Sequence, residues 1–171
     1  ISHKRPEQTG IRTGDRLAMV KLAIEGIPHF FLQTYEAEKR TVSYSYETME
    51  HLREACPERT FYYIIGADSL FQVETWKHPE RFLRSCTMIA AKREHRETDD
   101  ALESQIRHLK ERYKTVILFS RAPVFEVSSS KIREMVKRGE DIHHLVPPSV
   151  ASYIYNHHLY REDIEVEQRN S

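Results

Sequence analysis

Apolar and polar residues follow two different periods along this chain, and the two periods predict different elements. Short apolar runs of strand length occur at residues 29–35 (HFFLQTY), 61–65 (FYYII), 87–91 (TMIAA) and 115–119 (TVILF). The segments around these runs space their apolar residues by three and four, as amphipathic helices do. Strands that alternate with helices are typical of a parallel α/β sheet, which is the fold class we predict. The continuous run at 61–65 suits a strand covered on both faces.

The predicted helices begin at residues that suit a helix N-terminus. One helix runs from a cap at Thr13 to about Gly26, and a second runs from Ser45 to Pro57. Further helices are predicted at 69–74, 79–84, 102–113, after the serines at 128–130, and at 148–157. Residues 36–44 and 93–100 are charged and predict loops.

Length and composition narrow the class of protein. A chain of 171 residues fits one domain, which we place at residues 1–160, with a polar tail at 161–171. The 26 basic and 26 acidic residues give no net charge, which does not favour a general nucleic-acid or membrane surface. The spacing of Cys56 and Cys86 suggests neither a metal site nor a disulfide framework, so we expect reduced thiols in a cytoplasmic protein.

Three serines at the start of a predicted helix form a candidate phosphate site. A strand-like segment at 123–127 runs into Ser128, Ser129 and Ser130, and a helical pattern follows. The first turn of a helix has free N–H groups and a positive dipole end, so it attracts phosphate. Arg133 lies one turn further and can add a charged hydrogen bond. The alternative is an ordinary serine cap with a surface arginine.

Gly66 and Asp68 follow directly after the apolar run at 61–65. Ligands of open α/β sheets bind beyond the carboxyl ends of the strands, so Asp68 could accept hydrogen bonds from a ligand there. Trp76 comes shortly afterwards and could stack on an aromatic ring. The alternatives are a helix cap for Asp68 and a core position for Trp76.

Weaker candidates lie in two other segments. Tyr44 and Ser45 could offer hydroxyl groups to a ligand, or they could simply cap the following helix. Lys4 could neutralise a phosphate, or it could belong to a solvated tail. Neither a dinucleotide fingerprint nor a P-loop is present in the sequence.

Taken together and in this order, these segments resemble the bacterial nicotinate-mononucleotide adenylyltransferases. The resemblance runs from about residue 3 to residue 160. The matching segments are His3-Lys4, 15–24, 43–48, 63–70, Trp76, 127–133 and 145–150. The family's I-S-S-T-x-I-R motif is changed mildly here, at Val127 and Ser130.

The resemblance implies a Rossmann-like nucleotidyltransferase fold. It also implies transfer of AMP from ATP, with Mg²⁺, to nicotinate mononucleotide, which gives deamido-NAD and pyrophosphate. The residues that it assigns to ATP are Ser128, Ser129, Arg133, Gly66 and Asp68. Those that it assigns to the pyridine nucleotide are Tyr44, Ser45, Trp76 and Lys4.

One segment of the family pattern has no match in the sequence. The family's G-G-[ST]-F-D-P-x-H-x-G-H loop carries its catalytic histidines, so no catalytic residue is assigned here. We therefore expect a chain that is incomplete at its N-terminus and that exposes a strand edge, which would invite self-association. Two alternatives stay open: a related enzyme with another acceptor, and a silent fragment that binds a nucleotide or a protein.

Overall fold

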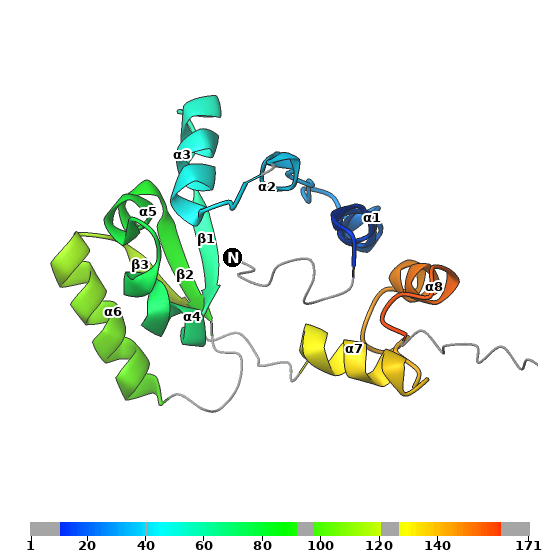
Figure 1. Cartoon of the computed structure of the whole chain (residues 1–171). Coiled ribbons are helices and arrows are strands. Elements are labelled where there is room, and N and C mark those ends of the chain that lie inside the picture. The colour runs from blue at the N-terminus through cyan, green and yellow to red at the C-terminus, as the bar shows by residue number, and fades with distance from the viewer. Residues whose placement is uncertain (1–10, 40, 92–97, 121–126, 162–171) are drawn as a thin grey trace, which may run out of the picture. The chain divides into compact units, whose positions relative to one another are not determined.

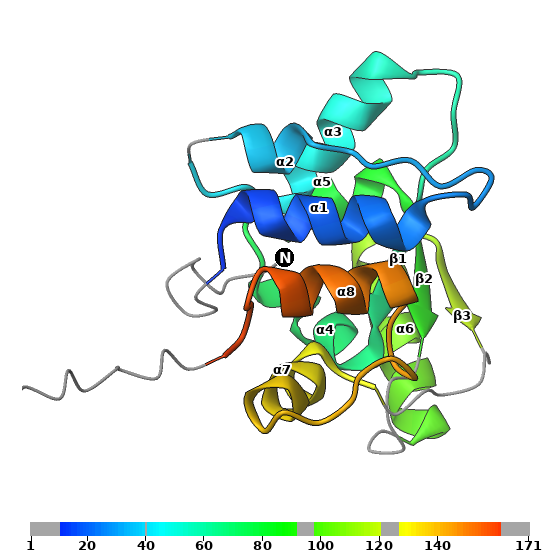
Figure 2. The ribbon, with the colours of Figure 1, turned by 90° about the vertical axis from the view of Figure 1, so that its right-hand side faces the viewer.

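The computed structural model describes residues 11–39, 41–91, 98–120 and 127–161. Its contacts divide the chain into two compact units. Unit 1 is Tyr35–Glu126, and unit 2 combines Ser2–Thr34 with Val127–Ser171. Figure 1 shows the elements of both units, and Figure 2 shows the same ribbon turned by 90°.

Unit 1 is built on a parallel sheet of three strands in the order β1-β2-β3. The strands are β1 (Tyr62–Gly66), β2 (Thr87–Ala91) and β3 (Ile117–Ser120). Its helices are α2 (Tyr35–Glu38), α3 (Ser45–Ala55), α4 (Ala67–Gln72), the 3₁₀ turn η2 (Val73–Thr75), α5 (Pro79–Ser85) and α6 (Asp99–Tyr113). The predicted parallel α/β class is confirmed, because strands and helices alternate as the apolar pattern requires.

One face of this sheet carries the core of unit 1. Ile65, Met88 and Ile117 point into it, and large side chains from the helices close over them. The fully buried helical contributors include Leu70, Phe82, Leu83, Leu102 and Leu109. Figure 1 shows α5 and α6 on the side of the sheet that these residues occupy.

The opposite face of the sheet is apolar but open within unit 1. Ile64, Val116 and Leu118 are 73%, 55% and 47% exposed. The apolar run at 61–65 predicted a strand with both faces covered, but the helices of unit 1 cover only one face of the sheet.

The predicted strand at 29–35 is wrong. Residues 29–34 form neither strand nor helix, and Tyr35 begins α2 inside the region predicted as a loop. Phe30 and Phe31 are exposed instead of packed. A strand is held by ladder hydrogen bonds to a neighbouring strand, and the sheet formed by the described residues consists of β1, β2 and β3 without this segment.

Unit 2 contains three helices around a small core: α1 (Thr13–Ile24), α7 (Ser129–Lys137) and α8 (Pro148–Asn156). Val136, Ile142 and Ile154 are fully buried or nearly so, and Met19 and Leu22 of α1 pack against this cluster. None of the described helices combines the length and the apolar character that a bilayer crossing requires.

The start of α1 differs from the sequence prediction. Arg12 occupies the N-cap position and Thr13 is the first helical residue, so Thr13 is not the cap. The buried carboxylate of Asp15 accepts hydrogen bonds from Arg12 Nε at 3.1 Å and from the Tyr153 hydroxyl at 3.0 Å. This pairing ties α1 to α8, because a buried carboxylate needs such partners to stay ionised.

Candidate functional site

The predicted site residues are divided between the two units. Tyr44, Ser45, Gly66, Asp68 and Trp76 belong to unit 1. Ser128, Ser129 and Arg133 belong to unit 2. Lys4 lies outside the described residues.

The carboxyl end of β1 carries Gly66 and, two residues later, Asp68. Gly66 is the last residue of β1 and also the N-cap of α4, with an ordinary extended backbone. Asp68 is therefore not the cap; it lies exposed in the first turn of α4. Gly66 aligns with Ala91 at the end of β2, which places Asp68 at the edge where α/β sheets bind ligands.

A line of side chains connects Ser45 to Trp76 within unit 1. The hydroxyl oxygens of Ser45 and Tyr63 lie 3.4 Å apart. The Tyr63 ring meets Phe82 edge to face at a centroid distance of 4.9 Å, and Phe82 meets Trp76 at 5.1 Å. Trp76 is only partly buried, so it combines a contact with the core and an accessible surface. A side chain held in this way can present a fixed aromatic face to a flat ring.

Tyr44 stands beside this line at the N-cap position of α3. Its side chain makes no capping hydrogen bond, and its ring lies 6.0 Å from that of Tyr46. Tyr46 in turn carries the Arg81 guanidinium over its ring at 4.4 Å. Tyr44 therefore occupies the N-cap position of α3, as the capping alternative predicted, but its hydroxyl does not cap the helix.

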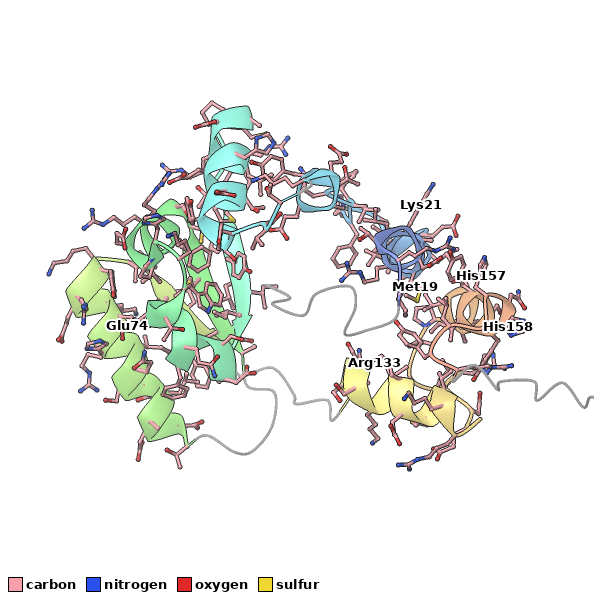
Figure 3. All side chains as sticks on the ribbon, in the orientation of Figure 1. Met19, Lys21, Glu74, Arg133, His157 and His158 are labelled. Carbon is pink, nitrogen blue, oxygen red and sulfur yellow. The ribbon has the colours of Figure 1, made fainter. Side chains whose placement is uncertain are left out.

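Glu74 fixes the turn that leads to Trp76. Its carboxylate accepts a hydrogen bond from the Tyr113 hydroxyl at 3.0 Å and lies 3.2 Å from His108 Nε2 and 3.4 Å from Arg112 Nη1. All three partners belong to α6, and Figure 3 shows Glu74 on the side facing this helix. Burial acts to raise the pKa of Glu74, but the bonds from Tyr113 and His108 outweigh it and lower that pKa. The cluster therefore stabilises η2 mainly while Glu74 is ionised.

Replacing Glu74 by alanine is expected to destabilise the protein by about 1–3 kcal/mol at pH 7, because the nearly buried Tyr113 hydroxyl loses its acceptor. A lowered folded pKa means that the contribution is complete above the unfolded pKa, about 4.3, and is lost as the pH falls through the folded value. Urea unfolding at pH 7 and near pH 3 measures this. The control is Glu111→Ala, which removes an exposed acid from α6, the helix that carries the partners of Glu74. An equal loss in both variants, or no pH dependence, contradicts the assignment.

The start of α7 combines a serine cap, an exposed serine and an arginine one turn further. Ser128 is the N-cap of α7, and its Oγ accepts a hydrogen bond from Lys131 N at 3.2 Å. It therefore caps the helix, as the alternative of an ordinary serine cap predicted. Its hydroxyl proton stays available to a ligand. Ser129 is exposed in the first turn, which contains no acidic residue. Arg133 Nη2 donates to Ser130 Oγ at 3.0 Å, which keeps the guanidinium at this end of the helix (Figure 3).

Three neighbours of the predicted residues were not found by sequence reasoning. Tyr63 was predicted only as part of an apolar strand and Phe82 only as part of a helix, and the fold shows that they join Ser45 to Trp76. Arg16 of α1 is the third. Burial raises the pKa of Tyr160, while the charges of Arg133 and Arg16 oppose this shift, so both guanidinium groups act on one neighbourhood of unit 2. The charge pattern of α1 gave no signal for this.

Comparison with known proteins adds to the geometry. A cytidylyltransferase-like family model matches residues 1–135. The chain is 37% identical over 156 residues to a probable nicotinate-nucleotide adenylyltransferase of Lachnoclostridium phytofermentans, covering 91% of this chain and 78% of that protein. It is 34% identical to the corresponding protein of Lactiplantibacillus plantarum, covering 92% of this chain and 68% of that protein.

A solved structure shares the fold. It is the nicotinic acid mononucleotide adenylyltransferase of Plasmodium falciparum complexed with NaAD, which superimposes with a TM-score of 0.68 at 20% identity. The match covers 91% of this chain and 78% of that one. The family model, the relatives and the fold agree: this chain belongs to the cytidylyltransferase-like family, in the group of the nicotinate-nucleotide adenylyltransferases.

Proposed function

We propose that this protein transfers the adenylyl group of ATP to nicotinate mononucleotide, forming deamido-NAD and pyrophosphate in NAD biosynthesis. The observation that carries the proposal is Trp76, partly buried and held against Phe82 beside the carboxyl end of a nucleotidyltransferase sheet. The relatives that share the chain's sequence along most of its length are named for this reaction.

The reaction needs positioning more than covalent help. A phosphate oxygen of nicotinate mononucleotide attacks the α-phosphorus of ATP and forms the new P–O bond. The bond from the α-phosphorus to the bridging oxygen breaks, and pyrophosphate leaves with the electron pair. Charge builds up on the leaving oxygens, so hydrogen-bond donors and cations that wait there lower the barrier.

In this proposal the start of α7 supplies those groups. The hydroxyls of Ser128 and Ser129 and the free N–H groups of the first turn bind phosphate oxygens, and Arg133 adds a charged hydrogen bond. Gly66 and Asp68 bind the nucleotide at the end of β1. Lys4 stays a proposed phosphate contact from the family resemblance alone. No residue is assigned as catalytic.

Mg²⁺ enters the proposal with ATP. Among the described residues no three acidic, histidine or cysteine side chains lie close enough together to hold a metal ion. Mg²⁺ commonly keeps several waters and binds substrate phosphates instead of an all-protein cage, so the substrate is written as the MgATP complex. The free thiols Cys56 and Cys86 fit a reducing compartment, and the cytoplasm is the proposed location.

The aromatic surface of Trp76 favours a flat pyridine ring over a pantetheine arm as the acceptor. Tyr44 and Ser45 then contact the same nucleotide. Whether the ring carries a carboxylate or an amide is the finer choice, and the names of the relatives favour the carboxylate.

Parallel assays of the full-length protein test the acceptor. MgATP is supplied with nicotinate mononucleotide, nicotinamide mononucleotide or 4′-phosphopantetheine, and the products are separated by chromatography. We expect deamido-NAD to form with the highest kcat/KM. Faster turnover with phosphopantetheine would assign the protein to another acceptor. If calorimetry shows that ATP binds but no acceptor is turned over, the protein is a catalytically silent nucleotide-binding protein instead.

A further inference from the structure

A cavity of unit 1 lies at the opposite end of the strands from Gly66. Its volume is about 330 Å³. Thr60 and Phe61 line it just before β1, Thr87 at the first residue of β2, and Val116 just before β3. Five strand residues at about 3.3 Å each separate it from the carboxyl edge of the sheet, so a ligand here does not meet a nucleotide bound at Gly66.

The charged residues that line this cavity are all basic: Arg53, Arg59, Arg84 and Lys114. Arg84 and Lys114 have no acidic partner within the described part of the chain. Arg59 contacts the exposed Glu58 at 3.4 Å, and Arg53 donates to the carbonyl oxygen of Arg84. Four cationic side chains thus line one cavity of a protein whose net charge is zero.

Helix ends explain only a part of this concentration. α3, α5 and α6 end close to the cavity, and a cation near a helix C-terminus offsets the negative end of its dipole. Each dipole end is equivalent to roughly half an elementary charge, so three of them offset about one and a half of the four positive charges. Glu58 offsets one more at Arg59. An anion from solution can neutralise the remainder.

The uncharged lining suits the oxygen atoms of a phosphate. The hydroxyls of Ser85 and Thr115 already donate to backbone carbonyls, to Phe82 at 2.7 Å and to Leu83 at 2.5 Å. The hydroxyls of Thr60 and Thr87 have no such partner in the described residues and can donate to a ligand. One arginine side chain can donate two parallel hydrogen bonds to two oxygens of a phosphate, which makes the interaction directional.

We propose that this cavity is a binding site for a small soluble molecule carrying a phosphate group, held by Arg84, Lys114 and Arg53. Phe61 and Val116 give the cavity an apolar wall for the rest of such a molecule. The site is separate from the proposed adenylyl transfer and does not depend on it.

A phosphate titration followed by ¹H–¹⁵N NMR of the full chain tests the site, with inorganic phosphate as the probe and sodium chloride keeping the ionic strength constant. We expect saturable shifts of the amides at 84–87 and 114–116. Arg84→Gln with Lys114→Gln should weaken this binding by about 10-fold or more, because two charged hydrogen bonds are lost.

The control removes two cations elsewhere, Lys21→Gln with Arg107→Gln, and should leave the binding unchanged; Figure 3 shows Lys21 pointing away from α1. Circular dichroism of both variants establishes that they fold. Shifts that chloride alone reproduces, that never saturate, or that persist in the Arg84/Lys114 variant overturn the proposal. Sedimentation of the protein with phosphatidylglycerol vesicles, but no response to free phosphate, assigns the anion to a lipid headgroup and also overturns it.

Discussion

Replacing Arg133 by alanine is expected to lower kcat/KM for ATP by about 10- to 150-fold, because one charged hydrogen bond contributes about 1.5–3 kcal/mol. Arg133 is partly buried, and its Nη2 atom lies 3.0 Å from Ser130 Oγ at the first turn of α7. The guanidinium therefore adds a charge at the helix end where phosphate is proposed to bind. Steady-state kinetics with ATP varied and nicotinate mononucleotide saturating measures the effect.

Arg138, the C-cap residue of α7, provides a matched control at the other end of the helix. It lies in exposed ion pairs with Glu134 at 3.0 Å and Glu140 at 3.8 Å, beyond the last helical residue and away from the first turn. Arg138→Ala should change the kinetics little, and Arg133→Lys should retain part of the activity, because a lysine keeps the charge but loses the paired donors. Equal losses at Arg133 and Arg138, or unchanged kinetics in Arg133→Ala, would remove α7 from the ATP site.

Local sequence patterns predicted the elements that local physics determines. Ser128 marks the start of α7 because its hydroxyl accepts a hydrogen bond from one of the N–H groups that a helix leaves unpaired at its first turn. Ser45 also marks a helix start, but as the first residue of α3 after the N-cap Tyr44 and without a capping bond. The runs at 61–65, 87–91 and 115–119 became strands because β1, β2 and β3 pair with one another in sequence order. The run at 29–35 looked similar but is not a strand of the sheet among the described residues, and no pattern within it could reveal that.

Contacts between residues far apart in the chain could not be predicted from local sequence patterns. Glu74 meets Tyr113 and His108 across 39 and 34 positions, and Phe82 joins Trp76 to Tyr63 through packing alone. The four cations of the cavity lined by Arg84 and Lys114 come from four different segments, so the balanced overall charge concealed their concentration. Local patterns singled out the candidate site residues, but only the family resemblance assigned them to ATP or to the pyridine nucleotide, because it encodes long-range geometry that periodicity does not.

Trp76→Ala is expected to raise the KM for nicotinate mononucleotide by about 5- to 150-fold, because stacking of an aromatic side chain on a base contributes about 1–3 kcal/mol. The KM for ATP should change much less, since the predicted ATP groups lie on other elements. The loss of the indole also leaves a void against Phe82, so the melting temperature is measured in parallel and the kinetics are recorded well below it.

Two further variants separate stacking from packing. Trp76→Phe keeps an aromatic face and should recover most of the affinity for nicotinate mononucleotide. Phe71→Ala removes a partly exposed ring from the neighbouring helix α4 and should leave both KM values near those of the parent protein. A Trp76→Ala protein that melts early but binds the mononucleotide normally would make Trp76 a core residue only. An equal rise in both KM values would point to a general loosening of unit 1, because stacking on one substrate affects that substrate alone.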